Sequence, residues 1–214
     1  MKKDLGDLRK VYEKGSLEIS SVGKDPLLFF KKWFDQAQSD IKIDEPNAFS
    51  LSTNGIDGFP KSRIVLLKSF DIEGFVFFTN YNSEKGKDIS SNSKVGISFF
   101  WPSLERQIII KGNAFKLEGS ISDKYFDSRP IGSRLGAIAS DQSQVISNRD
   151  VLENKLDNLK KVYKKTHPKR PKSWGGYKIR PVSYEFWQGR PNRLHDRIIF
   201  EKTLNKWFVS RLSP

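Results

Sequence analysis

The feature that most constrains the fold is a series of short β-type segments between residues 47 and 117. They are rich in β-branched and aromatic residues, and Gly, Asn and Asp separate them, as in NGIDG at 54–58 and DIEG at 71–74. Turns of this composition join neighbouring antiparallel strands. We expect strands at residues 47–53, 61–68, 75–80, 95–101 and 106–117. The first half of the chain is therefore predicted to be an antiparallel meander.

Helical patterns interrupt the strands without dividing the chain. Asp25 and Pro26 precede apolar residues at helical spacing, which is typical of a helix N-terminus. We expect further helices at 83–91 and in the stretch from 122 to 165, and last strands at 177–180, 184–188, 194–201 and 206–212. This order predicts an α+β protein, mainly antiparallel β, built as a barrel or curled sheet with flanking helices. Residues 25–214 are expected to form a single domain, after a polar arm at 1–24 that is flexible unless a ligand or partner orders it.

Composition removes several classes of function. The chain has no Cys and only two His, His167 and His195, which argues against disulfides, thiolate nucleophiles and His-rich metal sites, so we expect no metal. It has no apolar run of membrane-spanning length, and its N-terminus is charged, so a soluble, unexported, cytoplasmic protein is expected. The net charge of +13 indicates an anionic partner: nucleic acid, a membrane surface or a phosphorylated small molecule.

The segment NRLHDR at 192–197 is the most informative motif. On a strand, Arg193, His195 and Arg197 would share one face, and such neighbours repel one another unless an anion lies among them. The alternative is the solvated outer face of an edge strand.

Two further groups could bind phosphate. Tyr125 and Arg129 are four residues apart on one predicted helix face, with Ser133 just beyond Pro130; the alternative is a surface Arg lying over a Tyr. In SRIVLLK at 62–68, Arg63 and Lys68 have opposite parity, so a regular strand would direct them to two different anions. Here the alternative is a pair of cations that cap the ends of a buried strand.

Amide side chains complete the candidate set. Gln107, Gln142 and Ser143 stand where they could bind the edge of a heteroaromatic ring, because an amide offers both a donor and an acceptor. The chain contains no Gly-rich phosphate loop or dinucleotide fingerprint.

Taken together, these segments resemble the pyridoxine (pyridoxamine) 5'-phosphate oxidase family from about Leu8 to Pro214. The matching blocks are SRIVLLK, FFTN, LERQ, YFDSRP, SWGGY, EFWQG and NRLHDR. The resemblance implies an FMN-binding split β-barrel, Greek-key-like, and a homodimer whose two interface active sites each use both subunits. It also implies oxidation of pyridoxamine 5'-phosphate or pyridoxine 5'-phosphate by O2 to pyridoxal 5'-phosphate, with no nucleic-acid or membrane partner.

The resemblance also assigns residues. Those implied to hold FMN are Arg63, Ile64, Val65, Leu66, Leu67, Lys68, Phe78, Thr79, Lys85, Gln107, Gln142, Ser143, Trp187 and Arg197. Those implied to bind the substrate are Arg9, Lys10, Val11 and Tyr12 of the arm, Lys68, Tyr125, Arg129 and Ser133 at the phosphate, and Arg193, Leu194 and His195 at the ring. Arg193 and His195 are the implied catalytic residues.

One position departs from the family pattern, which has Ser-Arg-Lys where this chain has Ser83, Glu84 and Lys85. A carboxylate beside a phosphate dianion is unfavourable. We therefore expect that Glu84 points to solvent or pairs with a neighbouring Lys, or that FMN binds more weakly.

Two rival functions remain at this point. Another split-barrel flavoprotein, such as a flavin reductase, would keep the flavin residues but would not need Tyr125, Arg129, Ser133, Arg193 and His195. A basic nucleic-acid-binding module would use the +13 charge on phosphate backbones, although many of the lysines lie on polar helix faces and in PKRPK at 168–172.

Overall fold

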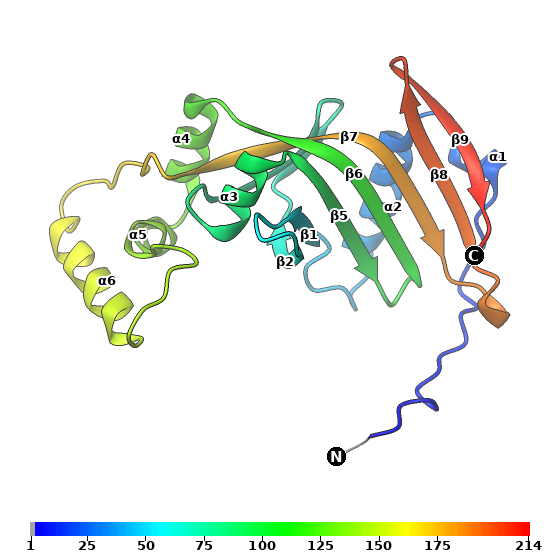
Figure 1. The fold of residues 1–214 in the computed structure, drawn as a ribbon, viewed down its shortest axis with the longest axis horizontal. Helices are drawn as coiled ribbons and strands as arrows, with labels where there is room; N and C mark the ends of the chain where they lie inside the picture. Colours follow the sequence, from blue (N-terminus) through cyan, green and yellow to red (C-terminus); the bar gives the residue numbers. More distant parts are fainter. Residues whose placement is uncertain (1–2) are drawn as a thin grey trace. The chain divides into compact units, whose positions relative to one another are not determined.

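The computed structural model describes residues 3–214; Met1 and Lys2 of the expected arm lie outside the described residues. Figure 1 labels most of its elements. The strands are β1 (Ala48–Asn54), β2 (Pro60–Leu66), β3 (Ser69–Asp71), β4 (Gly74–Asn80), β5 (Lys94–Trp101), β6 (Arg106–Lys116), β7 (Trp174–Gln188), β8 (Asp196–Thr203) and β9 (Lys206–Leu212). The helices are α1 (Ile19–Val22), α2 (Pro26–Ser39), α3 (Glu84–Ser91), α4 (Gly119–Ser128), α5 (Ile131–Ala139), α6 (Asp150–Val162) and a 3-10 turn, η1 (Pro191–Arg193).

The strands pair in the order β2-β1-β5-β6-β7-β4-β3, while β8 pairs with β7 and β9 with β8. The pairs β3–β4, β4–β7, β7–β8 and β8–β9 are antiparallel. The expected α+β class with antiparallel strands is confirmed.

The chain forms two compact units. Within the described residues, the first unit comprises 3–50, 97–111 and 181–214, and the second comprises 51–96 and 112–180. Strands β1, β5, β6 and β7 contribute residues to both units. The expected boundary between an arm and a domain at residue 25 stays a prediction, although Leu17 and Val22, which precede it, are buried.

The core of the first unit is aromatic. The Asp25 carboxylate accepts the backbone N–H of Leu27 at 2.8 Å and so caps α2 as predicted. Helix α2 buries Phe29 and Trp33 against Phe186 of β7, with ring centroids 4.7 and 5.4 Å apart. Strand β8 joins β7 through pairs such as Phe186↔Ile198, and Figure 1 shows β9 on the far side of β8.

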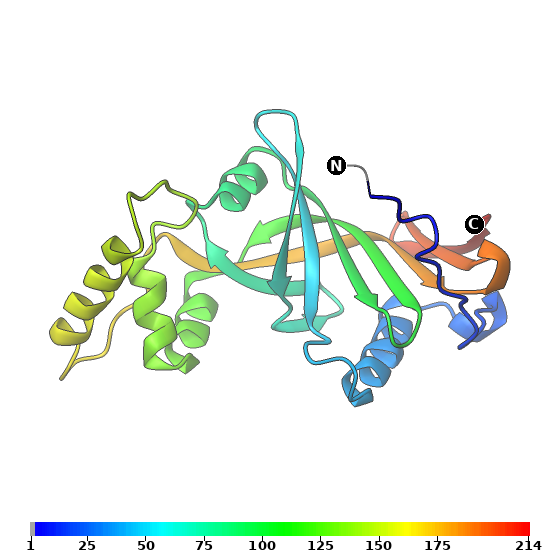
Figure 2. The same cartoon turned by 90° about the horizontal axis from the view of Figure 1, so that it is seen from below.

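In the second unit, β4 pairs with residues 174–179 of β7, from Phe75↔Ile179 to Asn80↔Trp174. Phe75, Phe77 and Ile179 are among its fully buried side chains. Helices α5 and α6 lie side by side (Figure 2, green and yellow), but none of the α6 residues is fully buried.

Two predicted element boundaries are wrong. The strands expected at 177–180 and 184–188 are one strand, β7, which continues through Pro181. Proline lacks an N–H, and Pro181 lies where β7 has finished pairing with β4, at Ile179, and has not yet begun pairing with β8, at Ser183. The strand expected from residue 194 begins only at Asp196, because Asn192 and Arg193 have positive φ angles of 57° and 61°.

Among residues 3–214, no helix combines the length and the apolar character that crossing a membrane requires. The same residues contain no group of three or more His, Asp or Glu side chains placed to hold a metal ion.

Candidate active site

The residues expected at the site fall into two groups, one in each unit. The group in the second unit surrounds a cavity of about 700 Å³. Its lining residues are Arg63, Ile64, Val65, Leu66, Lys68, Phe78, Thr79, Asn80, Lys85, Tyr125, Arg129, Pro130, Ser133, Gln142 and Trp174. Twelve of these fifteen were expected from the sequence; Asn80, Pro130 and Trp174 were not, although all three lie inside motifs that carry the family resemblance.

The cavity is strongly cationic. Arg63, Lys68, Lys85 and Arg129 line it, and none of the lining residues is an Asp or Glu. Arg63 and Lys68 were expected to project from opposite faces of one regular strand, which is wrong, because β2 ends at Leu66 and both residues line the same cavity. A single space thus offers positive charge to one or more phosphoryl groups.

Hydrogen bonds to neighbouring residues hold the Arg63 side chain in place. Its Nη1 donates to Thr53 Oγ1 at 2.7 Å, and Thr53 Oγ1 in turn donates to the buried Asp88 carboxylate at 2.7 Å. The Glu84 carboxylate pairs with Lys61 at 2.8 Å and lies 3.9 Å from Arg63 Nη2. The expectation that Glu84 pairs with a neighbouring Lys is therefore confirmed.

Lys85 is buried in the first turn of α3, with 8% of its surface exposed. Burial lowers the pKa of its ammonium group, and the nearby Arg63 lowers that pKa further, against the opposite effect of Glu84 and Asp88. A desolvated cation is unfavourable, so an anion beside Lys85 would be attracted to its ammonium group more strongly than it would be in water.

Aromatic rings form one wall of the cavity. Phe78 stacks on Tyr125 with centroids 3.8 Å apart, and Phe78 also stacks on Trp174 at 5.5 Å. The Arg129 guanidinium lies 4.7 Å from the centre of the Trp174 ring. Burial lowers the pKa of Arg129, and its Nη1 atom is buried without a hydrogen-bond partner among the described residues. A cation that lines the cavity and has an unpaired donor is suited to an anionic ligand.

Two more of the expected side chains bind each other here. Thr79 Oγ1 donates to Gln142 Oε1 at 3.2 Å. Ser133, expected just beyond the proline, lies in the first turn of α5, and Ser133 and Tyr125 both line the cavity. Leu67 is buried and Ser143 is exposed at a φ of 69°, and neither lines the cavity.

The second group lies in the first unit, around a cavity of about 590 Å³. It is lined by Leu8, Arg9, Lys10, Val11, Tyr12, Arg190, Asn192, Arg193 and His195. All four expected arm residues and both expected catalytic residues are thus brought together, whereas Leu194 is exposed and lines neither cavity.

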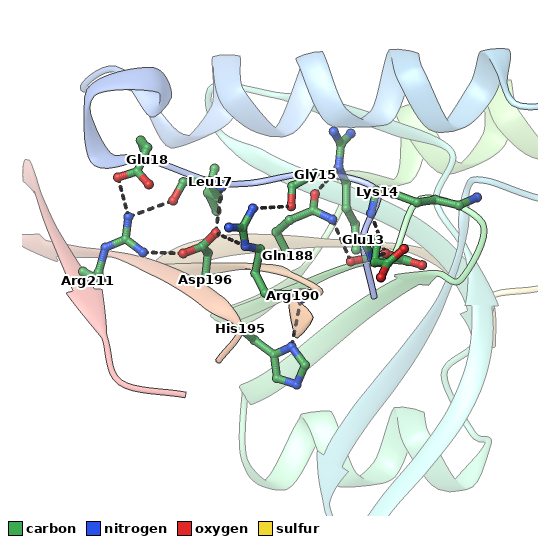
Figure 3. A network of polar contacts seen from close by, with 12 residues as sticks. Glu13, Lys14, Gly15, Leu17, Glu18, Gln188, Arg190, His195, Asp196 and Arg211 are labelled. Atoms are coloured by element: carbon green, nitrogen blue, oxygen red, sulfur yellow. Dashed lines mark hydrogen bonds and ion pairs between the residues drawn. The ribbon is translucent and has the colours of Figure 1, made fainter. Parts of the chain in front are cut away.

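His195 is oriented by the backbone. The N–H of Arg190 donates to His195 Nδ1 at 3.1 Å, so the neutral ring carries its proton on Nε2 (Figure 3). The ring lies 4.7 Å from Trp187 and 5.6 Å from Tyr12, between centroids. The expectation that Arg193, His195 and Arg197 share a strand face is wrong, because only Arg197 belongs to β8.

Gln107, Trp187 and Arg197 also lie in the first unit, on β6, β7 and β8. Arg197 Nε donates to Glu185 Oε1 at 2.8 Å, and this hydrogen bond raises the pKa of Arg197. The first unit therefore supplies three of the expected flavin residues together with the expected catalytic pair.

Comparison with known proteins shows which family the chain belongs to. Residues 34–163 match the family model described as "Pyridoxamine 5'-phosphate oxidase", and residues 174–214 match the "Pyridoxine 5'-phosphate oxidase C-terminal dimerisation region". The chain is 51% identical to a pyridoxine/pyridoxamine 5'-phosphate oxidase of Christiangramia forsetii over 214 residues, which is 100% of both chains. It is 52% identical to the enzyme of that name from Flavobacterium psychrophilum over 213 residues, 99% of this chain and 100% of the relative.

Solved structures share the fold. PhzG from Burkholderia lata, crystallised with tetrahydrophenazine-1-carboxylic acid, superposes with a TM-score of 0.85 at 29% identity, over 94% of this chain and 100% of PhzG. A pyridoxamine 5'-phosphate oxidase-related, FMN binding protein from Nostoc punctiforme gives a TM-score of 0.68 at 13% identity, over the same shares of the two chains. The split-barrel fold class expected from the sequence is confirmed. Two family models across most of the chain, and full-length relatives above 50% identity, show that the chain belongs to the pyridoxamine 5'-phosphate oxidase family of oxidoreductases.

Proposed function

We propose that this protein is an FMN-dependent oxidase that converts pyridoxamine 5'-phosphate or pyridoxine 5'-phosphate into pyridoxal 5'-phosphate. The alcohol and O2 would give the aldehyde and H2O2, and the amine, O2 and water would give the aldehyde, NH3 and H2O2. The observation that carries the proposal is the cavity of the second unit, where four cations meet without a carboxylate and Arg129 keeps a buried unpaired donor.

The residues of the cavity fit FMN. A phosphate would be bound by Arg63 and by Lys85, whose depressed pKa would be restored by the dianion. The strand segment Arg63–Leu66, Phe78, Thr79 and Gln142 would border the ring system; Gln107, Trp187 and Arg197 are proposed as further contacts, as the family resemblance implies. When bound, FMN would accept a hydride from the substrate carbon C4' and pass the electrons to O2.

Four other lining residues could bind a second phosphate, that of the substrate. Lys68, Tyr125, Arg129 and Ser133 supply an ammonium, a phenol, a guanidinium and a hydroxyl from four separate positions of the chain. Fixing the substrate phosphate at several points limits the orientations of its ring, and this loss of freedom before reaction lowers the barrier. These residues are proposed to orient the substrate and not to transfer protons.

Arg193 and His195 are proposed to act at the pyridine ring of the substrate. With Nδ1 bound to the Arg190 amide, neutral His195 presents an N–H at Nε2, so it is suited to donate a hydrogen bond to the substrate. In this state it is not suited to accept a proton through Nε2. Arg193, exposed in η1, would supply positive charge beside it.

We further propose a homodimer in which each active site uses residues of both subunits. The match of residues 174–214 to a dimerisation region supports this arrangement. Mixed refolding of Arg129→Ala and Arg193→Ala variants tests it: shared sites would restore activity, because one site of each mixed dimer would carry neither substitution. Mixed dimers as inactive as the parents would argue against shared sites.

The function itself is tested by anaerobic titration of FMN-loaded protein with pyridoxamine 5'-phosphate. Loss of the oxidised flavin absorbance near neutral pH, and its return when O2 is admitted, is the expected result. Flavin that stays oxidised would contradict the proposal.

The similarity to PhzG supports one alternative, oxidation of a tricyclic carboxylic acid of the kind bound in that structure. The phosphate-binding set of Lys68, Tyr125, Arg129 and Ser133 favours a phosphorylated substrate instead. Oxygen consumption with each substrate in parallel would separate these two activities, and NADH as a third substrate would detect a flavin reductase.

A further inference from the structure

Residues 13–18 are held by two carboxylates that line neither cavity, those of Glu105 and Asp196. Figure 3 labels Asp196 and several of the residues around it. Glu105 Oε2 accepts the backbone N–H groups of Glu13 at 2.8 Å and Lys14 at 3.0 Å. Asp196 Oδ2 accepts the N–H of Leu17 at 2.9 Å. Each carboxylate therefore binds main-chain donors of residues 13–18, and Glu105 Oε1 also lies 3.2 Å from the Lys10 ammonium group.

Glu105 is built into the protein at some conformational cost. Its side chain is 2% exposed, and its φ of 55° lies in the left-handed region that favours glycine. Its own carbonyl accepts the N–H of Gly189 at 2.7 Å and Gln188 Nε2 at 3.2 Å. A glycine would adopt this backbone more easily, so the presence of a glutamate points to a role for its side chain.

Asp196 is the centre of a second attachment. Its Oδ1 accepts Arg211 Nη1 at 2.6 Å, and Arg190 Nε lies 3.6 Å from Oδ2. Both arginines also donate to the segment itself, Arg190 to the Gly15 carbonyl at 3.0 Å and Arg211 to the Leu17 carbonyl at 2.8 Å. The main chain of residues 13–17 is thus bound through both donors and acceptors.

The residue next to this attachment is Tyr12, which contacts the candidate catalytic group. Its ring meets Trp187 and His195 edge-on, with both centroid distances at 5.6 Å. Because Glu13 follows Tyr12 directly, fixing the Glu13 amide fixes the point from which the Tyr12 side chain and the lining residues Leu8–Val11 extend.

We propose that Glu105 and Asp196 are positioning residues that fix the segment 13–18 and thereby hold Tyr12 against His195. Neither lines the cavity that His195 lines, so they act on it through the segment and through Lys10 and Arg190, two lining residues that pair with Glu105 and Asp196. The effect of this attachment on catalysis rests on the function proposed above. The attachment itself does not depend on that function.

Hydrogen exchange of backbone amides in the FMN-loaded full chain tests the attachment. In Glu105→Ala, protection of the Glu13 and Lys14 amides should fall by about tenfold or more, the effect of losing a hydrogen bond to a charged group, while Leu17 keeps most of its protection. In Asp196→Ala the Leu17 amide should lose protection, while the Glu13 and Lys14 amides keep most of theirs. Unchanged protection of Glu13 and Lys14 in Glu105→Ala would overturn the proposal.

Two further variants serve as controls for misfolding and for the loss of a negative charge. Lys14→Pro removes the Lys14 amide donor at an exposed residue and leaves Glu105 in place. The Glu13 amide should therefore lose protection from exchange in this variant, even if Glu105→Ala folds poorly. Glu201→Gln removes one negative charge from an exposed position on β8 and should leave all three amides protected. An equal loss of protection in Glu201→Gln would overturn the proposal.

Steady-state kinetics test the consequence for the reaction. Glu105→Ala should raise the KM for pyridoxamine 5'-phosphate by about tenfold with FMN retention unchanged, and Glu105→Gln, which keeps one acceptor oxygen, should recover part of this loss. A variant that loses amide protection but keeps wild-type KM and kcat would overturn the positioning role. If the wild-type protein does not oxidise this substrate, the proposed function fails, and the exchange measurements still decide the attachment.

Discussion

Replacing Arg129 by Met should affect stability and substrate binding very differently. In the ligand-free protein, the Arg129 guanidinium is partly desolvated, its Nη1 has no partner among the described residues, and its main packing contact is the Trp174 ring at 4.7 Å. Methionine fills a similar apolar volume without the charge. The substitution therefore removes an unfavourable buried donor together with a favourable cation–ring contact.

These two effects oppose each other. An unsatisfied buried donor costs about 1–3 kcal/mol, and a partly desolvated cation–π contact contributes about 0.5–2 kcal/mol. The free energy of unfolding without ligand should consequently change by between a loss of about 1 kcal/mol and a gain of about 2.5 kcal/mol. A substrate phosphate would lose a charge-assisted hydrogen bond of about 1.5–3 kcal/mol, which raises KM roughly tenfold to hundredfold.

Denaturant unfolding of the FMN-free protein and steady-state oxidation of pyridoxamine 5'-phosphate measure the two quantities. Arg149→Met is a matched control, because Arg149 is 85% exposed on the N-terminal side of α6, where it pairs with Glu153, and it should change neither quantity. An unchanged KM in Arg129→Met would remove Arg129 from the phosphate site. A loss of several kcal/mol of stability would show that the guanidinium is satisfied in the protein and would refute the reasoning.

Three further predictions concern charge. Glu84→Gln should tighten FMN binding by up to about fivefold in a fluorescence titration, because the carboxylate 3.9 Å from Arg63 is half-exposed and its repulsion of a phosphate is screened. Lys85→Met should weaken FMN binding by about tenfold to hundredfold in the same titration, and an unchanged affinity would exclude Lys85 from the phosphate site. Burial opposes ionisation of Glu105, but the Lys14 amide and the Lys10 ammonium outweigh it and lower the pKa of Glu105 below its ordinary 4.5. The attachment of residues 13–14 should therefore stay complete above pH 4.5 and be lost only as the pH falls through that lowered pKa, as amide exchange measured at several pH values would detect; loss already near neutral pH would contradict this sign.

Much of the fold could be predicted because local chemistry and tertiary structure agree. Asp25 caps α2 as its position before Pro26 predicts, and the turns after Asn54 and Asp71 separate the strands where Gly and Asp allow a sharp reversal. Pro181 misled the prediction, because a proline in mid-strand ordinarily marks a break. It is tolerated here where β7 changes partners, and a partner change is a property of the whole sheet that no local pattern records.

The lining of the cationic cavity could be predicted largely through family motifs and less through strand geometry. The alternation of side chains along a strand predicted Arg63 and Lys68 on opposite faces. The strand β2 ends between them, and both residues line one cavity. Trp174 was not predicted as a lining residue, since nothing in SWGGY distinguishes a packing tryptophan from one that supports a guanidinium. The attachment of residues 13–18 was also hidden, because Glu105 and Asp196 bind main-chain amides and leave no signal in the sequence of the segment.

The departure from strand geometry at NRLHDR has a chemical consequence. On a regular strand, His195 would share a face with Arg193 and Arg197. Instead, the positive φ angles of Asn192 and Arg193 turn the chain back, so that the Arg190 amide reaches His195 Nδ1. The ring is then held by one backbone donor and two aromatic neighbours, with Nε2 as the proton-bearing atom of the neutral form. A variant that restores extended backbone, such as Asn192→Val, should release this hydrogen bond and move the His195 side-chain NMR signals, while a distant β-branched substitution at an exposed strand position, Lys206→Val, should leave them unchanged.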